Sequence, residues 1–372
     1  MIEVREVKSR KEIREFLNFT NKLYKGNKCF VPPIYMDEKK CFKANYMYYD
    51  QAEAKYWNAY KDGKMVGRIS AIIQHKANEK WGQKRCRFTR FDAIDDQEVA
   101  KALFDTVEAY AKEKGMEEVV GPLGFSDLER EGLLIEGFEH LSTFEEQYNH
   151  SYYQKLIEGC GYGKDVDWIE HKLTINHEKY AKIERISDKI LEKGNYKLVP
   201  VMSYSKLCKK YGDQFFELLD ISYDKIYGTV PFTQGMKNLL MNNFKPIVNP
   251  RYTRFIVNKD DKVVAFAIAF PNIAKAMQTR NGHLTPLTII RLLHTVRHPK
   301  IIDLGLVGVL PEEALGGSQI VMFKVLSEQI IKDKIQYVET NLNLEDNHEI
   351  IRMWDHFNSI QHKRRRSFVK HI

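Results

Sequence analysis

The chain has 372 residues, of which 43% are hydrophobic and 29% charged, and its formal net charge is +8. This length and composition predict a globular protein of two domains. No apolar stretch approaches about 18 uncharged residues, which excludes a membrane span, and the charged start MIEVREVKSRKEIREF lacks the pattern of a signal peptide. The five cysteines are scattered without a CxxC pair, which argues against a disulfide framework and a zinc site. We therefore expect a cytoplasmic protein.

The first clear element is a β-hairpin over residues 57–73, WNAYKDGKMVGRISAII. Two runs rich in strand-forming residues flank Asp62-Gly63, a pair typical of tight hairpin turns. Another strand (RCRFTRFDAI), a helix over 98–113 and a further strand (MEEVVGPLG) follow. A short helix (SYYQKLIEGCGY) and a closing strand (WIEHKLTI) complete this half of the chain.

The same order of elements recurs in the second half. A hairpin over 254–270, RFIVNKDDKVVAFAIAF, is followed by an insertion, a strand (IIDLGLVGVL), a helix over 319–333 and a strand (QYVETNLNL). A short helix (HEIIRMWDHFNS) and a strand (RRSFVKHI) close this half too. The repetition predicts a duplicated α/β protein with domains at 1–176 and 196–372. The stretch between them, 177–195, has the spacing of a connecting helix and ends at a glycine.

A glycine pair stands where a strand passes into a helix in the second half. Residues 307–326 read VGVLPEEALGGSQIVMFKVL, so Gly316 and Gly317 directly precede the helical pattern. Backbone without a Cβ at a helix N-terminus suits a bound anion, which the free N–H groups and the helix dipole attract. An ordinary loop is the alternative, and this stretch by itself leaves both open.

The order of elements, together with two segments, resembles the GNAT superfamily of acyl-CoA-dependent N-acyltransferases. LGLVGVLPEEALGGSQ resembles its pyrophosphate-binding loop, and NLNLEDNHEIIRMWDHFNS resembles its later strand–Asn–helix segment. The tandem arrangement resembles two-domain members, and EREGLLIEGF and TRNGHLTPLTIIRLLHTVRHPK resemble a bacterial subgroup. The resemblance implies a mixed α/β sheet in two tandem GNAT-like domains, with the acyl-CoA loop in the second.

The resemblance also implies a site. Val309 and Leu310 would pair with the pantetheine arm of acyl-CoA or acetyl-CoA, and a backbone N–H near Val309 would stabilise the oxyanion. Gly316, Gly317 and Ser318 would face the pyrophosphate. An amine in the cleft between the domains would attack the thioester directly. The expected function is therefore acyl transfer from acyl-CoA to a small-molecule amine or an amino-acid-like acceptor.

Some positions depart from the family pattern. The loop usually reads Arg/Gln-x-x-Gly-x-Gly/Ala, but here Ala314, Gly317 and Gln319 occupy those positions. Trp354 stands where many members have a tyrosine that acts as general acid, and an indole cannot supply a proton. These departures support an alternative, a catalytically inactive GNAT-fold protein that binds a CoA-like or acyl ligand as a sensor or scaffold.

The first half departs further from the family. Its strand–helix junction has Asp95, Asp96 and Glu98 in place of glycines. Asp96 is a good helix N-cap, but the acids would repel a pyrophosphate. We expect a structural copy without a CoA site, which still forms one wall of the substrate cleft.

Three further sets of polar residues are candidates for the site. Glu339, in a predicted strand, is either a general base or an outward-facing residue on an alternating strand. Asn347 either contacts the cofactor or caps the following helix. Glu131 and Glu136, in EREGLLIEGF, either hold a cationic amine or are solvated loop charges.

Two basic segments raise other possibilities. The C-terminal HKRRRSFVKHI is either a nucleic-acid contact or, as we expect, a strand with a solvated face. LTPLTIIRLLHTVRHPK has the pattern of a basic amphipathic helix, with Leu287, Ile290, Leu293 and Val296 on one face. Such a helix packs on its own domain more often than on a membrane. No HExxH or P-loop pattern occurs, so neither a metal nor ATP bound by a P-loop is predicted.

Overall fold

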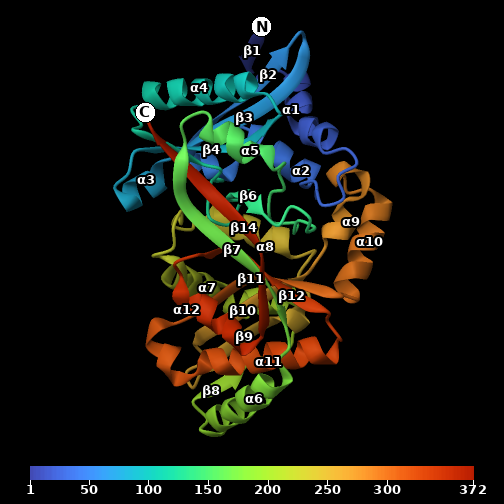
Figure 1. Ribbon diagram of the computed structural model, residues 1–372. Coiled ribbons are helices and arrows are strands. Elements are labelled where there is room, and N and C mark those ends of the chain that lie inside the picture. The colour runs from blue at the N-terminus through green and yellow to red at the C-terminus, as the bar shows by residue number, and fades with distance from the viewer.

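The computed structural model describes the fold of residues 1–372 and all side chains except those of Ala314 and Leu315 (Figure 1). The departure from the family loop at Ala314 therefore lies outside the described side chains. The strands form one 14-stranded sheet, with the order β1-β2-β3-β4-β5-β14-β7-β12-β11-β10-β9-β8. β6 adds to β14, and β13 adds to β7. The expected mixed α/β architecture is confirmed.

The elements follow the predicted order in both halves. The first half and the connecting helix comprise β1 (Ile2–Glu6), α1 (Arg10–Leu23), α2 (Tyr35–Glu38), β2 (Ala52–Lys61), β3 (Lys64–Gln74), α3 (His75–Trp81), β4 (Arg85–Ala93), α4 (Gln97–Glu113), β5 (Glu118–Gly121), β6 (Leu133–Glu136), α5 (Tyr152–Glu158), β7 (Gly163–Thr174) and α6 (His177–Glu192). The second half comprises β8 (Tyr196–Leu198), α7 (Tyr204–Tyr223), α8 (Gln234–Phe244), β9 (Thr253–Asn258), β10 (Val263–Pro271), α9 (Ala274–Met277), α10 (Pro286–Arg297), β11 (Ile301–Val309), α11 (Ser318–Lys332), β12 (Tyr337–Thr340), β13 (Asn343–Leu344), α12 (His348–Met353) and β14 (Asn358–His371).

Local chemistry explains two of the predicted boundaries. Asp62 and Gly63 both have positive φ, 52° and 74°, as the tight turn between β2 and β3 requires. At the start of α4, a carboxylate oxygen of Asp96 accepts a hydrogen bond from the Glu98 N–H at 3.0 Å. Lys61 neutralises the same carboxylate at 2.8 Å. The N-terminus of α4 is thus closed by the chain's own acid.

The two halves are joined by exchanged strands. β14, the last strand of the second half, lies between β5 and β7 of the first half, and β7 in turn pairs with β12. Figure 1 shows β7 and β14 running side by side through the middle of the molecule, between the first half above and the second half below. The division at 1–176, 177–195 and 196–372 remains a prediction, because each half includes a strand from the other side of that division.

The basic C-terminal segment forms the predicted strand, but the expectation of a solvated face is wrong for its two central cations. Lys363 and Arg365 are 1% and 0% exposed. The Lys363 ammonium contacts Glu339 and lies 3.3 Å from Glu170, and Arg365 Nε donates to Glu170 at 2.6 Å. The side chains alternate in direction along the strand, so the flanking arginines, Arg364 and Arg366, instead pair with Asp167 at 3.1 and 2.7 Å.

These ion pairs use the positive charge of the segment within the chain, which removes the basis for a nucleic-acid contact there. The Glu170 carboxylate receives both buried cations. Although burial opposes ionisation, Lys363 and Arg365 lower the pKa of Glu170 to about 2. The exchanged strands are therefore held by charges as well as by the sheet.

The insertion forms the predicted helix, α10, but with a different packing face. Thr288 and Leu292 are buried, whereas Leu287, Ile290 and Leu293 are 44%, 64% and 44% exposed. The apolar stripe is therefore wider than the side that packs on the domain. Among the described residues, no helix is both long and apolar enough to span a membrane.

Removing the shared carboxylate tests the contribution of the ion pairs to stability. Glu170→Gln leaves Lys363 and Arg365 buried with too little negative charge, so we expect the free energy of unfolding to fall by about 3–5 kcal/mol. Glu345→Gln, at a side chain 34% exposed that pairs with Lys164 and Arg364, is the matched control. It should cost no more than about 1 kcal/mol. Urea unfolding measures both, and equal stabilities of the two variants would contradict the assignment.

Candidate functional site

The site begins where β11 and β12 separate. The two strands pair in parallel from Ile301 to Leu304, and the last contact is the Asn341 N–H donating to Leu304 O at 3.1 Å. The register with β10 passes from Leu304 to Leu306 and skips Gly305, which marks a β-bulge. A Cβ on Gly305 would lie 2.3 Å from the Phe270 ring, so this bend requires glycine. Past it, β11 stays with β10 and diverges from β12.

A cavity of about 190 Å³ lies in this separation, and we call it the acid-lined cavity. One wall is the strand segment 304–307, and the opposite wall is the segment 340–344. Loops of the first half close it with five acids: Asp127, Glu129, Glu131, Glu145 and Glu146. The described lining side chains include no lysine, arginine or histidine. The described cavity lining therefore has carboxyl groups without a cationic side chain beside them.

Two of these acids are deeply buried and incompletely paired. Glu131 and Glu146 are 4% and 3% exposed. Oε1 of Glu131 and Oε2 of Glu146 accept no hydrogen bond from any described residue. The nearest cation to Glu146, Arg365, is 3.9 Å away and is committed to Glu170. Buried carboxylates without partners are costly, so a site that retains them favours a cationic ligand.

The proton affinities of the acids reflect this burial. Burial raises the pKa of Asp127 to about 6, that of Glu145 to about 7 and that of Glu146 to about 8, and it raises the pKa of Glu131 well above its usual value. Neighbouring carboxylates add to the effect for Glu131 and Glu146. The cavity thus contains groups that exchange protons near neutral pH, as general acid–base chemistry requires.

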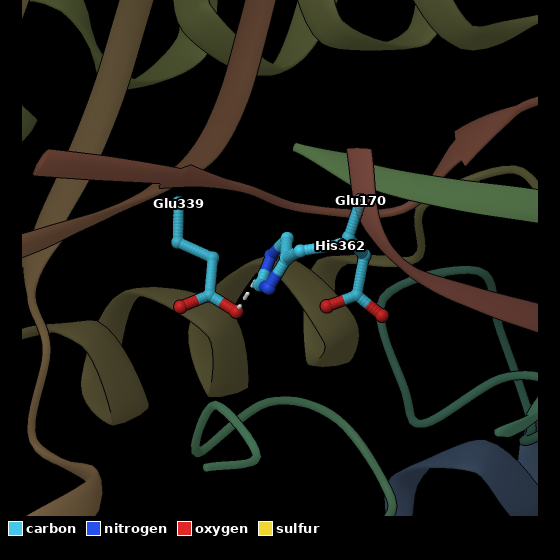
Figure 2. A group of neighbouring side chains, drawn as sticks. All are labelled: Glu170, Glu339 and His362. Carbon is cyan, nitrogen blue, oxygen red and sulfur yellow. Dashed lines mark ion pairs between the residues drawn. The ribbon is translucent and has the colours of Figure 1, made fainter. Parts of the chain in front are cut away.

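Glu339 lies behind the cavity rather than in its lining. It is 3% exposed, so the expectation of an outward-facing residue is wrong, and its role as a base remains a prediction. Figure 2 shows Glu170, Glu339 and His362 projecting to the same side of the sheet, with His362 Nε2 3.3 Å from Glu339 Oε1. Burial and the nearby Lys363 lower the pKa of His362 to about 3, so its imidazole is neutral.

Glu170, Glu339 and His362 together have the donor set of a metal site. Lys363, however, places its ammonium against both carboxylates, at 3.3 Å from Glu170 and in contact with Glu339. A metal ion would have to displace this buried cation. We therefore interpret the group as part of the ion-pair network of the exchanged strands.

The open edge of β11, which is the edge that no longer pairs with β12, borders the cavity at Val307. The Tyr223 hydroxyl donates to Val307 O at 3.2 Å, and the Val307 N–H faces the same oxygen at 3.4 Å. Val309 O accepts from Ser222 Oγ at 3.4 Å. The predicted Leu310 is different, because its N–H donates to Val264 O at 2.9 Å within the sheet and its side chain is in the core. Leu310 therefore has no free N–H for a ligand.

The glycine pair at the start of α11 is held by packing. Gly317 has a φ of +83° and caps the helix, and a Cβ on it would lie 2.6 Å from Ile190 of α6. A Cβ on Gly316 would lie 1.8 Å from the Tyr196 hydroxyl, which donates to Glu313 at 2.5 Å. Ser318 is fully buried and its hydroxyl donates to Glu313 O at 3.4 Å.

This geometry suits a CoA chain in outline. The N-terminus of the 15-residue helix α11 follows the end of β11, and the cavity opens along the same strand. The Glu313 carboxylate is the unfavourable feature, although the Tyr196 hydroxyl engages it. The closeness of the Tyr196 hydroxyl and the Ile190 side chain favours glycine at both positions through packing alone.

Asn347 and Trp354 have structural partners and also reach the cavity. The Asn347 side chain caps α12 by accepting from the Ile350 N–H at 3.3 Å, which confirms the capping alternative. Trp354 is buried and its indole N–H donates to Asn343 at 2.9 Å. Both line the acid-lined cavity.

The structure separates the two glutamates predicted to hold an amine. Glu131 lines the cavity, but Glu136 has a side chain 60% exposed and pairs with Arg364 at 3.5 Å. Sequence reasoning missed Glu145 and Glu146. Their signal was the adjacent acids in LSTFEEQYN, but nothing local shows that this loop folds over the end of a distant strand.

The fold resembles that of solved acetyltransferases. A tandem GNAT protein from the clavulanic acid biosynthesis pathway superposes with a TM-score of 0.57, at 11% identity, over 100% of this chain and 98% of that chain. The chain has a tandem GNAT fold.

Two curated proteins are similar in sequence to this tandem GNAT chain. Protein YghO of Escherichia coli strain K12 is 26% identical over 380 residues, which cover 99% of this chain and 95% of YghO. The bacterial ceramide synthase of Caulobacter vibrioides is 25% identical over 294 residues, 77% of this chain and 74% of that protein. No protein-family model matches the chain.

The packing of the loop gives a direct test. Gly316→Ala should displace Tyr196 from Glu313 and lower the free energy of unfolding by about 1–3 kcal/mol, and it should also weaken acyl-CoA binding as the loop shifts. Gly212→Ala, in α7 where a Cβ meets nothing within 4 Å, is the control. It should be neutral or up to about 1 kcal/mol stabilising. Thermal unfolding and calorimetric titration measure the two effects.

A second variant separates packing from other causes. Tyr196→Phe removes the hydroxyl, so in the Gly316→Ala background the nearest contact becomes the ring carbon at 3.0 Å. The double variant should recover part of the lost stability. A double variant no more stable than Gly316→Ala alone would show that Tyr196 is not the reason for the glycine.

Proposed function

We propose that the protein transfers an acyl group from acyl-CoA to a cationic amine. The observation that carries this proposal is the acid-lined cavity, with five carboxylates and no cation among its described lining residues, beside the open edge of β11. The tandem GNAT fold supports a thioester donor. A ceramide is an N-acylated amine, so the name of the Caulobacter relative agrees with this reaction class.

The donor would lie along β11 with its anionic end at α11. The helix N-terminus at Gly316, Gly317 and Ser318 would face the pyrophosphate, and the open edge of β11 near Val307 and Val309 would pair with the pantetheine arm. The oxyanion donor would be the Val307 N–H, which donates to the Tyr223 hydroxyl at 3.4 Å beside the cavity and would exchange this long bond for the oxyanion. Asn347 lines the acid-lined cavity.

The acceptor would enter from the side of the first half as an ammonium ion. Glu131 and Glu146 bind the positive charge, which compensates their burial without a partner. Glu145 has a pKa of about 7 and lines the same cavity, so it is better suited as the base than Glu339, which contacts Lys363. Glu145 takes one proton from the ammonium and leaves a neutral amine.

The bond changes are those of direct aminolysis. The amine nitrogen attacks the thioester carbon, and the new C–N bond forms as the C–S bond breaks. The second proton lost from nitrogen neutralises the departing CoA thiolate. The products are an amide, free CoA thiol and protonated Glu145, which returns its proton to solvent.

The pH dependence of the rate tests Glu145. Since the base must be ionised, kcat should rise with pH up to about 7 and level off above that value. Glu145→Gln should lower kcat by about 10²–10⁴-fold and remove this limb. Glu139→Gln, in the same loop region with a side chain 74% exposed, should keep the wild-type profile. CoA thiol release and mass spectrometry of the amide provide the readout, and an unchanged profile in Glu145→Gln would exclude this base.

Glu131→Gln tests the ammonium site in two ways. The KM for the amine should rise roughly 10–100-fold, because a neutral amide replaces a charged acceptor. The folded-state pKa of Glu131 is raised above the usual 4.5. The free energy of unfolding of the wild type therefore falls as the pH rises from 4.5 to the folded-state pKa, and it stays at the lower value above that pKa. The Gln variant lacks this loss and should be more stable than wild type at pH 8. Thermal unfolding between pH 5 and pH 8 measures the difference; a less stable variant at pH 8 would contradict the prediction.

The inactive alternative makes the opposite prediction for turnover. A ligand-binding protein without transfer chemistry would bind acyl-CoA at one site per chain and release no CoA thiol with any amine. The carboxylates near neutral pKa favour the enzyme, because a binding protein has no need for a proton acceptor at the cavity.

A further inference from the structure

A second and larger cavity adjoins the acid-lined one. It has a volume of about 490 Å³, within the usual range of ligand cavities, and we call it the apolar cavity. Its walls come from the N-terminal segment before α2, from α8 and from the α9–α10 region. Buried apolar side chains line it, among them Val31, Ile247, Ile273 and Met277. A volume with such walls suits a hydrocarbon.

The two cavities meet at a shared border. Leu128, Glu129, Glu145 and Phe244 line both of them. Glu129 already accepts hydrogen bonds from the Tyr46 hydroxyl at 3.2 Å and the Phe125 N–H at 3.0 Å. The Glu145 carboxylate accepts from its own backbone N–H and forms no ion pair with another described residue, so it is the border carboxylate open to a ligand.

The mouth of the apolar cavity exposes large apolar side chains. Three lining residues are also partly open to solvent: Leu284, just before α10, is 41% exposed, and Ile289 and Leu293 of α10 are 42% and 44% exposed. Exposed apolar surface of this kind is costly in water, and clustered at a cavity mouth it marks a binding surface. A hydrocarbon chain leaving the cavity would cover it.

We propose that the apolar cavity binds the hydrocarbon chain of the acceptor, so the acceptor is a long-chain primary amine with its ammonium group at Glu145. This inference rests on the proposed function and adds the substrate class. The chain runs from the shared border towards α10, and the reacting nitrogen stays in the acid-lined cavity beside β11.

The border carboxylates distinguish the acceptor chain from the acyl chain of the donor. A ligand with a cation at one end and a hydrocarbon at the other satisfies Glu145 and the apolar walls together. An acyl chain crossing the border would bury Glu145 against hydrocarbon without compensation. Two arginines elsewhere in the wall are already paired, Arg68 with Asp92 at 2.8 Å and Arg90 with Glu38 at 2.9 Å. Arg130, a third, donates to Phe144 O at 3.2 Å.

A chain-length series tests the proposal without catalysis. Calorimetric titration of the full chain with butylamine, octylamine and dodecylamine, below their aggregation limits and without acyl-CoA, should show affinity rising about three- to fourfold per added methylene. Dodecanoate, with the same chain and a negative head, should bind at least tenfold more weakly than dodecylamine. No dependence on chain length, or equal binding of dodecanoate, would overturn the proposal.

Two tryptophan variants on one helix localise the chain. Leu293→Trp fills the mouth and should weaken dodecylamine binding at least tenfold while leaving butylamine unchanged. Ile290→Trp, on the same helix, 64% exposed and absent from the cavity lining, should bind both as wild type does. If Leu293→Trp instead weakens a long-chain acyl-CoA and leaves dodecylamine unaffected, the cavity serves the donor and the proposal is wrong.

The same experiments separate this inference from the proposed function. Tight dodecylamine binding without release of CoA thiol from acyl-CoA would refute acyl transfer and leave the chain site in place. Acylation of butylamine as efficient as that of dodecylamine would support transfer and refute the chain site.

Discussion

The fold depends on one buried group of charges. Glu170 on β7 receives Lys363 and Arg365 from β14, and Glu339 on β12 contacts Lys363 from the other side. These three strands are neighbours only because the two halves exchange their last strands. Separation of the halves would leave Glu170 without its two cations, Arg365 without this carboxylate and Lys363 with Glu339 alone, in an apolar setting. Breaking such buried pairs is far more costly than losing surface pairs. The charges thus specify the exchanged pairing, and the pairing holds the loops of the first half over the open edge of β11.

The acids of the acid-lined cavity differ from those of the strand network in how well they are paired with cations. In the strand network every carboxylate has a cation within 3.3 Å, and the pKa of Glu170 is lowered to about 2. A short distance along the same face, Glu146 has only Arg365 at 3.9 Å, and its pKa is raised to about 8. The chain therefore pairs buried acids where they serve the fold and leaves them unpaired where the cavity opens. Unpaired burial lowers stability, and the charge of the proposed amine would compensate for it.

The repeated order of elements could be predicted from the sequence because hairpin turns, helical spacing and caps are local. Asp62-Gly63, Asp96 and the pattern over 98–113 all have their effect within a few residues. The buried state of Lys363 and Arg365 could not, since runs of basic residues are usually exposed and the partner Glu170 is 193 residues from Lys363. Glu131 was found because it lies in a glycine-rich segment, whereas Glu145 needed the fold to bring its loop to β11. The packing face of α10 was misjudged because its apolar residues extend around more than one side.

The glycine pair at 316–317 has two possible explanations, one from the local sequence and one from tertiary packing. A helix N-terminus preceded by glycines suggests an anion, but here Tyr196 and Ile190 approach so closely that a Cβ at either position would require a side chain to shift. The two explanations are compatible, since side chains that press on the loop also fix the direction of its N–H groups before any ligand arrives. A preorganised loop loses less entropy on binding than a flexible one. The connecting helix and β8, which supply Ile190 and Tyr196, would therefore shape the donor end of the proposed site, while the loops of the first half would shape its acceptor end. Under the proposed function, both ends of the reaction would then lie in the single separation between β11 and β12, while Asp96 closes the N-terminus of α4 in the first half.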